Sequence, residues 1–285
     1  MKKMISSLSW IINHPSNKNS FFPTIIRLFI WKLNQLSLKI PVVVEIEKGI
    51  KFKCYPDSSW GGLVIYTKLP EYFEMKFVNK IINKKDIVID VGSNLGSYSL
   101  IAASKMSSGK VYAFEPSKIA YKRLLENIKL NNFENKIIPL DLAVSDKKGR
   151  ISFSETDRSE VSHVSYLQFK QGLKVRSITL DNFVKRQKIK KIRLLKIDVE
   201  GYEYKVLKGA SEILEKGIVD YLLVEINRDS LLYSIEPSKT INLLKQYRYN
   251  IYFFPNSSQL TPISKYGGTK KTINMIGIHK DIQRI

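Results

Sequence analysis

Residues 86–116 constrain the fold of this chain more than any other segment. Asp86–Val91 is short, apolar and rich in β-branched residues, which predicts a buried strand, and Lys110–Glu115 repeats the pattern. Between them, a loop with two glycines leads into Ser97–Met106, whose apolar residues have helical spacing. A strand, a crossover helix and a second strand of this kind normally lie in one parallel sheet. The segment therefore predicts an α/β fold.

The same alternation of apolar runs and helical patterns continues toward the C-terminus. We predict seven strands, which fit one doubly wound, mostly parallel sheet with helices on both faces. The last two are separated by the turn-rich stretch Pro255–Gly268, so we expect an antiparallel terminal strand. The predicted strands are Asp86–Val91, Lys110–Glu115, Lys136–Val144, Arg193–Val199, Tyr221–Ile226, Asn250–Phe254 and Thr272–His279.

Two segments depart from a simple alternation. Ser117 is a predicted N-cap for the helix Lys118–Leu130, whose apolar stripe comprises Ile119, Leu124, Leu125 and Ile128. Residues 145–180 break the rhythm with a turn and two predicted strands, Ile151–Ser154 and Lys174–Leu180. We expect this β insertion to lie beside the active site of a domain that spans residues 81–285.

The N-terminal residues 1–80 combine an amphipathic helix, Phe21–Leu38, with a short β pattern over Pro41–Cys54. We interpret them as an accessory cap. Arg27 and Lys32 interrupt the apolar residues of this helix, and the remaining apolar run is too short to span a bilayer. No transmembrane segment is therefore predicted. We expect it either to pack on the domain or to rest on a membrane surface. Cys54, the one cysteine of the sequence, suits a reducing compartment, and we expect a cytoplasmic protein, either free or attached to a membrane surface.

The formal net charge of +21 raises the question of a nucleic-acid partner. Residues 1–85, 86–225 and 226–285 have net charges of +9, +6 and +6, from 14, 24 and 9 Lys and Arg against 5, 18 and 3 Asp and Glu. The densest basic run, Val184–Arg193, lacks interleaved aromatic residues for base stacking. Because the excess is spread along the chain, nucleic acid is not an expected partner.

The loop Asp90-Val-Gly-Ser-Asn-Leu-Gly96 stands where α/β sheets bind their ligands, after a buried strand and before a helix. A dinucleotide loop would have a second glycine at position 94, where this chain has Asn94, and would not place Asp90 beside two phosphates. S-adenosylmethionine carries an ammonium and a sulfonium and no phosphate, so an acid is favourable there. The predicted donor-binding residues in this loop are Asp90, Gly92, Asn94 and Gly96.

Three more residues complete the predicted donor site. Glu115 ends the second strand, where a carboxylate can accept hydrogen bonds from both ribose hydroxyls. Asp141 and Ala143 end the third predicted strand, where we expect them to meet the adenine.

A second charged group follows the fourth strand. Lys196, Asp198 and Glu200 occupy alternate positions, so one face of a strand and its exit would carry all three. Interior parallel strands are normally apolar, and charges on one side at the carboxyl end indicate a catalytic site.

At this point the sequence resembles the FkbM-type methyltransferases. The resemblance spans roughly residues 70–255, and its most specific part is Lys196-Ile-Asp-Val-Glu-Gly-Tyr-Glu203. It implies a class I methyltransferase (Rossmann-like) fold, S-adenosylmethionine as donor, and O-methylation of a hydroxyl on a sugar, glycan, lipid or secondary metabolite. Ser93 departs from the alanine of many relatives, a small-for-small change. The other motifs that carry the resemblance are Asp90–Gly96, Val111–Pro116, Thr179–Asp181 and Val224–Ile226.

Methyl transfer to oxygen requires that the acceptor oxygen be aligned and its proton removed. Our hypothesis is that Asp198 removes the proton of the acceptor hydroxyl. Alternatively, Asp198 with Glu225 or Asn227 would hold a divalent cation that acidifies the hydroxyl. His163 is a further candidate base.

Other interpretations of the N-terminal flank and of the function stay open. The resemblance suggests that Glu71 and Tyr72 close over the donor. Ribose 2′-O-methylation of RNA is one alternative function. A non-catalytic S-adenosylmethionine-binding protein of a glycan assembly complex is another.

Overall fold

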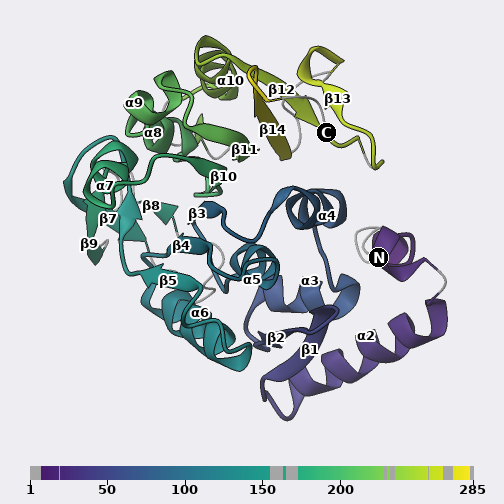
Figure 1. Ribbon diagram of the computed structural model, residues 1–285. Helices are drawn as coiled ribbons and strands as arrows, with labels where there is room; N and C mark the ends of the chain where they lie inside the picture. Colours follow the sequence, from purple (N-terminus) through teal and green to yellow (C-terminus); the bar gives the residue numbers. More distant parts are fainter. Residues whose placement is uncertain are drawn as a thin grey trace.

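A computed structural model describes residues 8–18, 20–154, 163–164, 173–227, 230–231, 235–255, 257–265 and 272–282. Its main feature is a sheet with the strand order β13-β12-β14-β11-β10-β3-β4-β5 (Figure 1). Strands β11, β10, β3, β4 and β5 run parallel, whereas β14 is antiparallel to both of its neighbours, β11 and β12. The strands are β3 (Ile87–Val91), β4 (Lys110–Phe114), β5 (Ile137–Leu140), β10 (Ile192–Ile197), β11 (Val219–Ile226), β12 (Tyr249–Phe253), β13 (Thr261–Pro262) and β14 (Ile273–His279).

Both faces of this sheet are covered by helices. Alternate residues of a strand point to opposite faces, so in β3 Val88 joins one hydrophobic cluster while Ile89 and Val91 join the other. The first cluster lies under α3, α4, α5 and α6, and the second under α7, α8, α9 and α10 (Figure 1). These helices are α3 (Ser59–Thr67), α4 (Tyr72–Ile81), α5 (Ser97–Ser104), α6 (Lys118–Leu130), α7 (Leu180–Arg186), α8 (Glu203–Lys208), α9 (Ser211–Glu215) and α10 (Pro237–Gln246).

The doubly wound, mostly parallel sheet with its antiparallel terminal strand is confirmed, with two differences. The sheet has an eighth member, because the two-residue β13 pairs with β12. The predicted strand Lys136–Val144 is wrong as one element, because it ends at Leu140 and a turn follows, closed by a 2.8 Å hydrogen bond from the Leu142 amide to the Leu140 carbonyl. The chain then leaves the main sheet.

The predicted β insertion forms a small sheet of its own, with the order β6-β9-β7-β8. The prediction Lys174–Leu180 is two residues too long, since Thr179 caps α7 through a hydrogen bond from the Asn182 amide. The strands are β6 (Ala143–Val144), β7 (Gly149–Ser154), β8 (His163–Val164) and β9 (Leu173–Ile178), followed in the chain by α7.

The helix α6 begins and ends where the sequence predicts, and Ser117 accepts a hydrogen bond from the Ala120 amide as its N-cap. Its buried side is narrower than the predicted stripe. Leu124 and Ile128 are buried, but Ile119 and Leu125 are exposed. The other buried residues of this helix are the small Ala120 and the polar Asn127, and Asn127 accepts a hydrogen bond from the Lys53 amide of the N-terminal segment.

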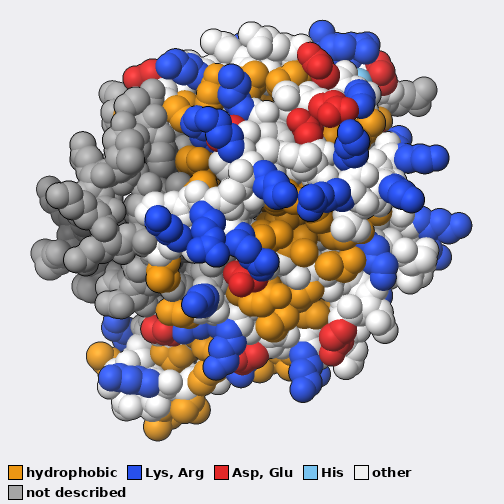
Figure 2. Space-filling model, turned by 90° about the vertical axis from the view of Figure 1, so that its left-hand side faces the viewer, with side chains coloured by type: hydrophobic (Ala, Val, Ile, Leu, Met, Phe, Trp, Pro, Cys, Tyr) orange, Lys and Arg blue, Asp and Glu red, His pale blue; other side chains and the backbone are white. Residues whose placement is uncertain are grey.

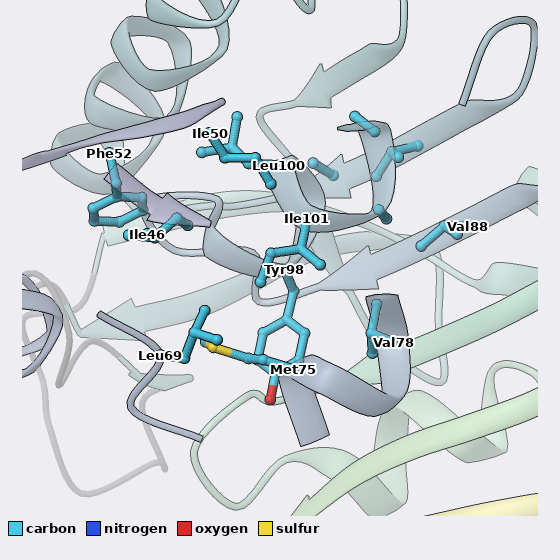
Figure 3. Packing of buried hydrophobic residues seen from close by; sticks show 14 of the residues in the cluster. Ile46, Ile50, Phe52, Leu69, Met75, Val78, Val88, Tyr98, Leu100 and Ile101 are labelled. Carbon is cyan, nitrogen blue, oxygen red and sulfur yellow. The ribbon is translucent and has the colours of Figure 1, made fainter. Parts of the chain in front are cut away.

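The N-terminal segment packs on the first cluster. Ile46, Ile50 and Phe52 of its hairpin share this cluster with Leu100 and Ile101 of α5 (Figure 3). The core is therefore continuous from the hairpin to the main sheet. The segment contains η1 (Pro15–Asn17), α2 (Phe21–Leu36), β1 (Val42–Glu47) and β2 (Ile50–Cys54), and the short η4 (Ile263–Lys265) lies near the C-terminus.

Lys and Arg side chains are spread over the described surface. Figure 2 shows them dispersed among hydrophobic and polar side chains rather than gathered in one dense field on the face that it presents. This agrees with the positive net charge of all three parts of the sequence.

Asn127 connects three elements in the core, and its replacement tests how tightly they are joined. Its side chain is fully buried, donates to the Leu95 carbonyl at 3.0 Å and accepts from the Lys53 amide at 2.7 Å. Asn127→Ala would leave both backbone groups unsatisfied, so we expect a loss of about 2–4 kcal/mol in the free energy of unfolding, measured by urea denaturation. The exposed Lys129→Ala on the same helix should change it by less than about 0.5 kcal/mol. Equal effects of the two variants would contradict this role.

Candidate functional site

The loop after β3 winds through left-handed backbone at every second residue. The φ angles are 74° at Gly92, 50° at Asn94 and 92° at Gly96. Asparagine tolerates this region better than other residues with a side chain, which accounts for Asn94 in a position where a dinucleotide loop has glycine. The loop is tied to β4 by hydrogen bonds of 3.0 Å from the Gly92 and Ser93 amides to the Phe114 carbonyl.

Gly92 also lets two loops meet. A Cβ at this position would overlap the backbone carbonyl oxygen of Asp198, and the positive φ would add strain. The Asp198 amide in turn donates to the Val91 carbonyl at 3.0 Å. The predicted donor loop and the predicted acceptor side are therefore in direct backbone contact.

Asp90 is buried at the end of β3 and has two polar neighbours. Its Oδ2 accepts a 2.6 Å hydrogen bond from Ser99 Oγ, and its Oδ1 lies 3.9 Å from Lys196 Nζ. Burial raises the pKa of Asp90, and the nearby Lys196 opposes that rise. Within the described part of the chain, Asp90 Oδ1 and Asn94 Oδ1 are buried acceptors without a hydrogen-bond partner. Such acceptors fit a ligand that brings N–H groups.

Glu115 follows β4 and holds the loop from the other side. Its Oε2 accepts from the Asn94 amide and its Oε1 from the Ser117 amide, both at 2.8 Å. Burial raises the pKa of Glu115 to about 7, although these two hydrogen bonds act in the opposite direction. A carboxylate oxygen can accept more than one hydrogen bond, so the side chain still has capacity for hydroxyl donors.

The structure separates the two residues expected at the adenine. Ala143 is buried in β6, whereas Asp141 is exposed in the turn after β5. Their contact with adenine stays a prediction.

Lys196 lies between the two predicted halves of the site. It is 5% exposed, and its Nζ is 3.0 Å from Asp198 Oδ2 and 4.9 Å from the centroid of the Tyr98 ring. Burial alone would lower the pKa of Lys196, but the carboxylates of Asp198 and Asp90 raise it above its usual value. Lys196 is therefore a permanent cation that joins the donor-loop acid to the acceptor-side acid.

The alternation predicted for Lys196, Asp198 and Glu200 ends after Asp198. Glu200 has a φ of 53°, so it leaves the strand pattern. Its Oε2 accepts from Asn227 Nδ2 at 3.3 Å, and the same amide donates to Glu225 Oε1 at 3.0 Å. The turn itself is braced by Glu203, whose Oε1 accepts from the Val199 and Gly201 amides.

Glu225 faces several acids at the end of β11. Burial and the neighbouring Asp198 and Glu71 raise the pKa of Glu225 to about 10. The raised pKa favours the protonated form of Glu225, which can donate a hydrogen bond.

Sequence reasoning missed Tyr98, Ser99 and Asn274. Tyr98 Oη donates to Glu71 Oε2 at 2.7 Å, and Asn274 Nδ2 donates to the other oxygen of Glu71. Tyr98 and Ser99 follow the glycine loop by two and three residues, which was an available signal. Asn274 pairs with Glu225 across β14 and β11, a register that the sequence does not reveal.

The remaining candidates have other surroundings. His14 is buried and bonds to the Pro70 carbonyl, while the side chain of His163 lies outside the described residues. Tyr72 packs edge-on against His14 and Phe73. Among the residues that the structure describes, no three or more His, Cys, Asp or Glu side chains are grouped so that they could hold a metal ion. A divalent cation held by Asp198 with Glu225 or Asn227 stays a prediction.

Comparison with known proteins identifies the family of this chain. A family model described as the methyltransferase FkbM domain matches residues 90–252. The hexuronic acid methyltransferase AglP of Haloferax volcanii is 30% identical over 161 residues, which cover 56% of this chain and 62% of AglP. The 2-O-methyltransferase NoeI of Sinorhizobium fredii is 25% identical over 158 residues, 48% of this chain and 62% of NoeI.

A third relative, the methyltransferase sdnD of Sordaria araneosa, is 26% identical over 156 residues, 44% of this chain and 60% of sdnD. The chain thus spans about three-fifths of the length of these curated relatives. The family match begins at Asp90 near the end of β3, includes the loop after it, continues through β10 and β11, and reaches β12. The chain belongs to the FkbM methyltransferase domain family.

Proposed function

We propose that this chain is an S-adenosylmethionine-dependent O-methyltransferase that methylates a hydroxyl group of a carbohydrate. The observation that carries the proposal is the direct contact between the loop at Gly92 and the carboxylate-bearing turn at Asp198. It would bring a donor site and a general base together at one edge of the main sheet.

The donor side suits the cation and the ribose of S-adenosylmethionine. The buried acceptors Asp90 Oδ1 and Asn94 Oδ1 would receive N–H groups of its amino-acid part, and Glu115 would receive its ribose hydroxyls. When bound, S-adenosylmethionine supplies a methyl group activated by a positive sulfur.

On the acceptor side, Asp198 is suited to remove a proton. Lys196 Nζ contacts Oδ2 of Asp198, while the Asp198 side chain is 27% exposed. An entering hydroxyl can therefore reach the Asp198 carboxylate. With the donor bound, Asp198 would take the proton of an acceptor hydroxyl aligned with the activated methyl group, and the methyl group would replace that proton on the acceptor oxygen. Lys196 holds the carboxylate in place.

A carbohydrate acceptor is supported by the polar surroundings and by two relatives. Glu71 and Glu225 lie close enough to Asp198 for their charges to interact, and Asn227 joins Glu225 to Glu200. Such a group of polar side chains suits a molecule with several hydroxyls. AglP is named for a hexuronic acid and NoeI for a 2-O position.

The proposal is tested by incubating the protein with methyl-labelled S-adenosylmethionine and a panel of oligosaccharides, including ones that contain hexuronic acids. We expect label in a product that withstands mild alkali, as a methyl ether does. Alkali-labile label would indicate a methyl ester and would contradict O-methylation of a hydroxyl.

Asp198→Asn tests the assigned base. It keeps the shape of the side chain but cannot take the proton, so we expect kcat to fall by about 10²- to 10⁴-fold. Binding of S-adenosylmethionine, measured by calorimetry, should change by less than about threefold, because Asp90 and Glu115 are intact. The exposed Asp57→Asn serves as a control with unchanged kcat. Near-normal turnover of Asp198→Asn would exclude Asp198 as the base.

Glu115 makes donor affinity depend on pH. Its carboxyl pKa is about 7, and ribose hydroxyls bind the ionised form, so affinity should rise with pH, by up to about tenfold between pH 6 and pH 8. 5′-Methylthioadenosine is the suitable probe, since it lacks the amino group of the donor. In Glu115→Gln the rise should disappear. A rise that persists in this variant would assign it to another group.

A further inference from the structure

The helix α2 turns its apolar side away from the protein. The exposed side chains recur at helical spacing and form one stripe, with exposed fractions from 49% at Leu33 to 76% at Phe22. In Figure 1, α2 runs along the edge of the molecule, with α3 and the β1–β2 hairpin on its inner side. We call this stripe the α2 face; it comprises Phe22, Ile26, Phe29, Ile30, Leu33 and Leu36.

This orientation is fixed by contacts on the opposite side of the helix. Trp31 is 2% exposed and belongs to the core, and Asn34 exchanges hydrogen bonds with both backbone groups of Ile40. Arg27 donates to Asn17 and Thr24. These contacts define the inner side of the helix. The α2 face is the opposite side, and it is not the side that packs on the protein.

Apolar residues before and after the helix are exposed as well. Trp10, Leu38, Ile40 and Val43 have exposed fractions between 46% and 68%. Large exposed apolar surfaces are rare on a monomer and mark a site of interaction with a membrane or another protein.

The charges around the α2 face favour a lipid surface. Residues 1–44 contain no Asp or Glu, while Lys and Arg occur at positions 2, 3, 18, 27, 32 and 39. Lys18, Lys32 and Lys39 are exposed. If a second copy of the chain bound here, the lysines of the two copies would face and repel each other. The negative charges of an anionic bilayer would instead attract these lysines.

We propose that the α2 face docks the protein on an anionic phospholipid surface, with α2 lying in the plane of the interface. Aromatic and aliphatic side chains on one side and flanking lysines are the features of such interfacial helices. Within the described ranges, no helix has the length and apolar character needed to cross a bilayer. The proposed contact is therefore a docking of one helix face.

The docking surface borders a groove of the N-terminal segment. A groove of about 920 Å³ is lined by residues of the N-terminal segment, by Phe21 and Phe22 of α2, and by Tyr72 and Phe73 of α4. These two aromatic residues directly follow Glu71, which binds Tyr98. Docking would bring this groove to the lipid surface.

Vesicle co-sedimentation of the full chain tests the proposal. We expect binding to phosphatidylcholine vesicles that contain phosphatidylglycerol, and weaker binding when phosphatidylglycerol is omitted or salt is raised. Phe29→Ser with Leu33→Ser should reduce the partition coefficient by about tenfold or more. The matched control is Leu125→Ser with Leu173→Ser, which removes exposed apolar groups elsewhere on the protein. This control should leave the partition coefficient unchanged.

Two results would overturn the proposal. One is equal sedimentation of the α2 variant and the control variant. The other is a dimer in light scattering that the α2 variant dissociates, which would make the face an interface between two copies. Circular dichroism spectra of both variants that match the wild-type spectrum would show that the fold is retained.

Discussion

The buried ammonium of Lys196 is the interaction on which the rest of the site depends. A lysine inside a parallel sheet is stable as a cation when carboxylates surround it, and here Asp198 and Asp90 lie on two sides of it. Without that charge the two acids would repel each other across a short distance. Lys196 therefore joins the proposed donor loop of one strand to the proposed catalytic turn of its neighbour.

The backbone makes the same connection as the charges. Gly92 and Asp198 touch because β3 and β10 are parallel neighbours, paired from Val88–Leu194 to Val91–Ile197. Both loops leave the same edge of the sheet, where α/β folds bind their ligands. The proposed reaction follows from this arrangement, since a methyl donor on one loop is presented to a base on the other.

The sequence predicted the parts that depend on local pattern. The strands around Asp90 and Lys196 and the capped helix after Ser117 are short-range features, and the structure places them within a few residues of the prediction. The break after Leu140 was missed because a turn with neither glycine nor proline leaves little signal.

The missed contacts depend on tertiary register. The network from Tyr98 through Glu71 to Asn274 joins residues up to 203 positions apart, and Asn274 reaches the site only because β14 inserts between β11 and β12. Likewise, an apolar stripe on Phe21–Leu38 predicts an amphipathic helix but not which side faces the protein, since Trp31 and Asn34 decide that by their contacts.

The central claim is that the loop at Asp90–Gly96 and Glu115 form an S-adenosylmethionine site that opens toward Asp198. A crystal structure of the protein with S-adenosylhomocysteine tests it most directly. The account predicts ribose hydroxyls on Glu115, the amino-acid part against Asp90 and Asn94, and the sulfur directed toward Asp198. A ligand whose ribose does not contact Glu115, or whose sulfur points away from Asp198, would contradict it.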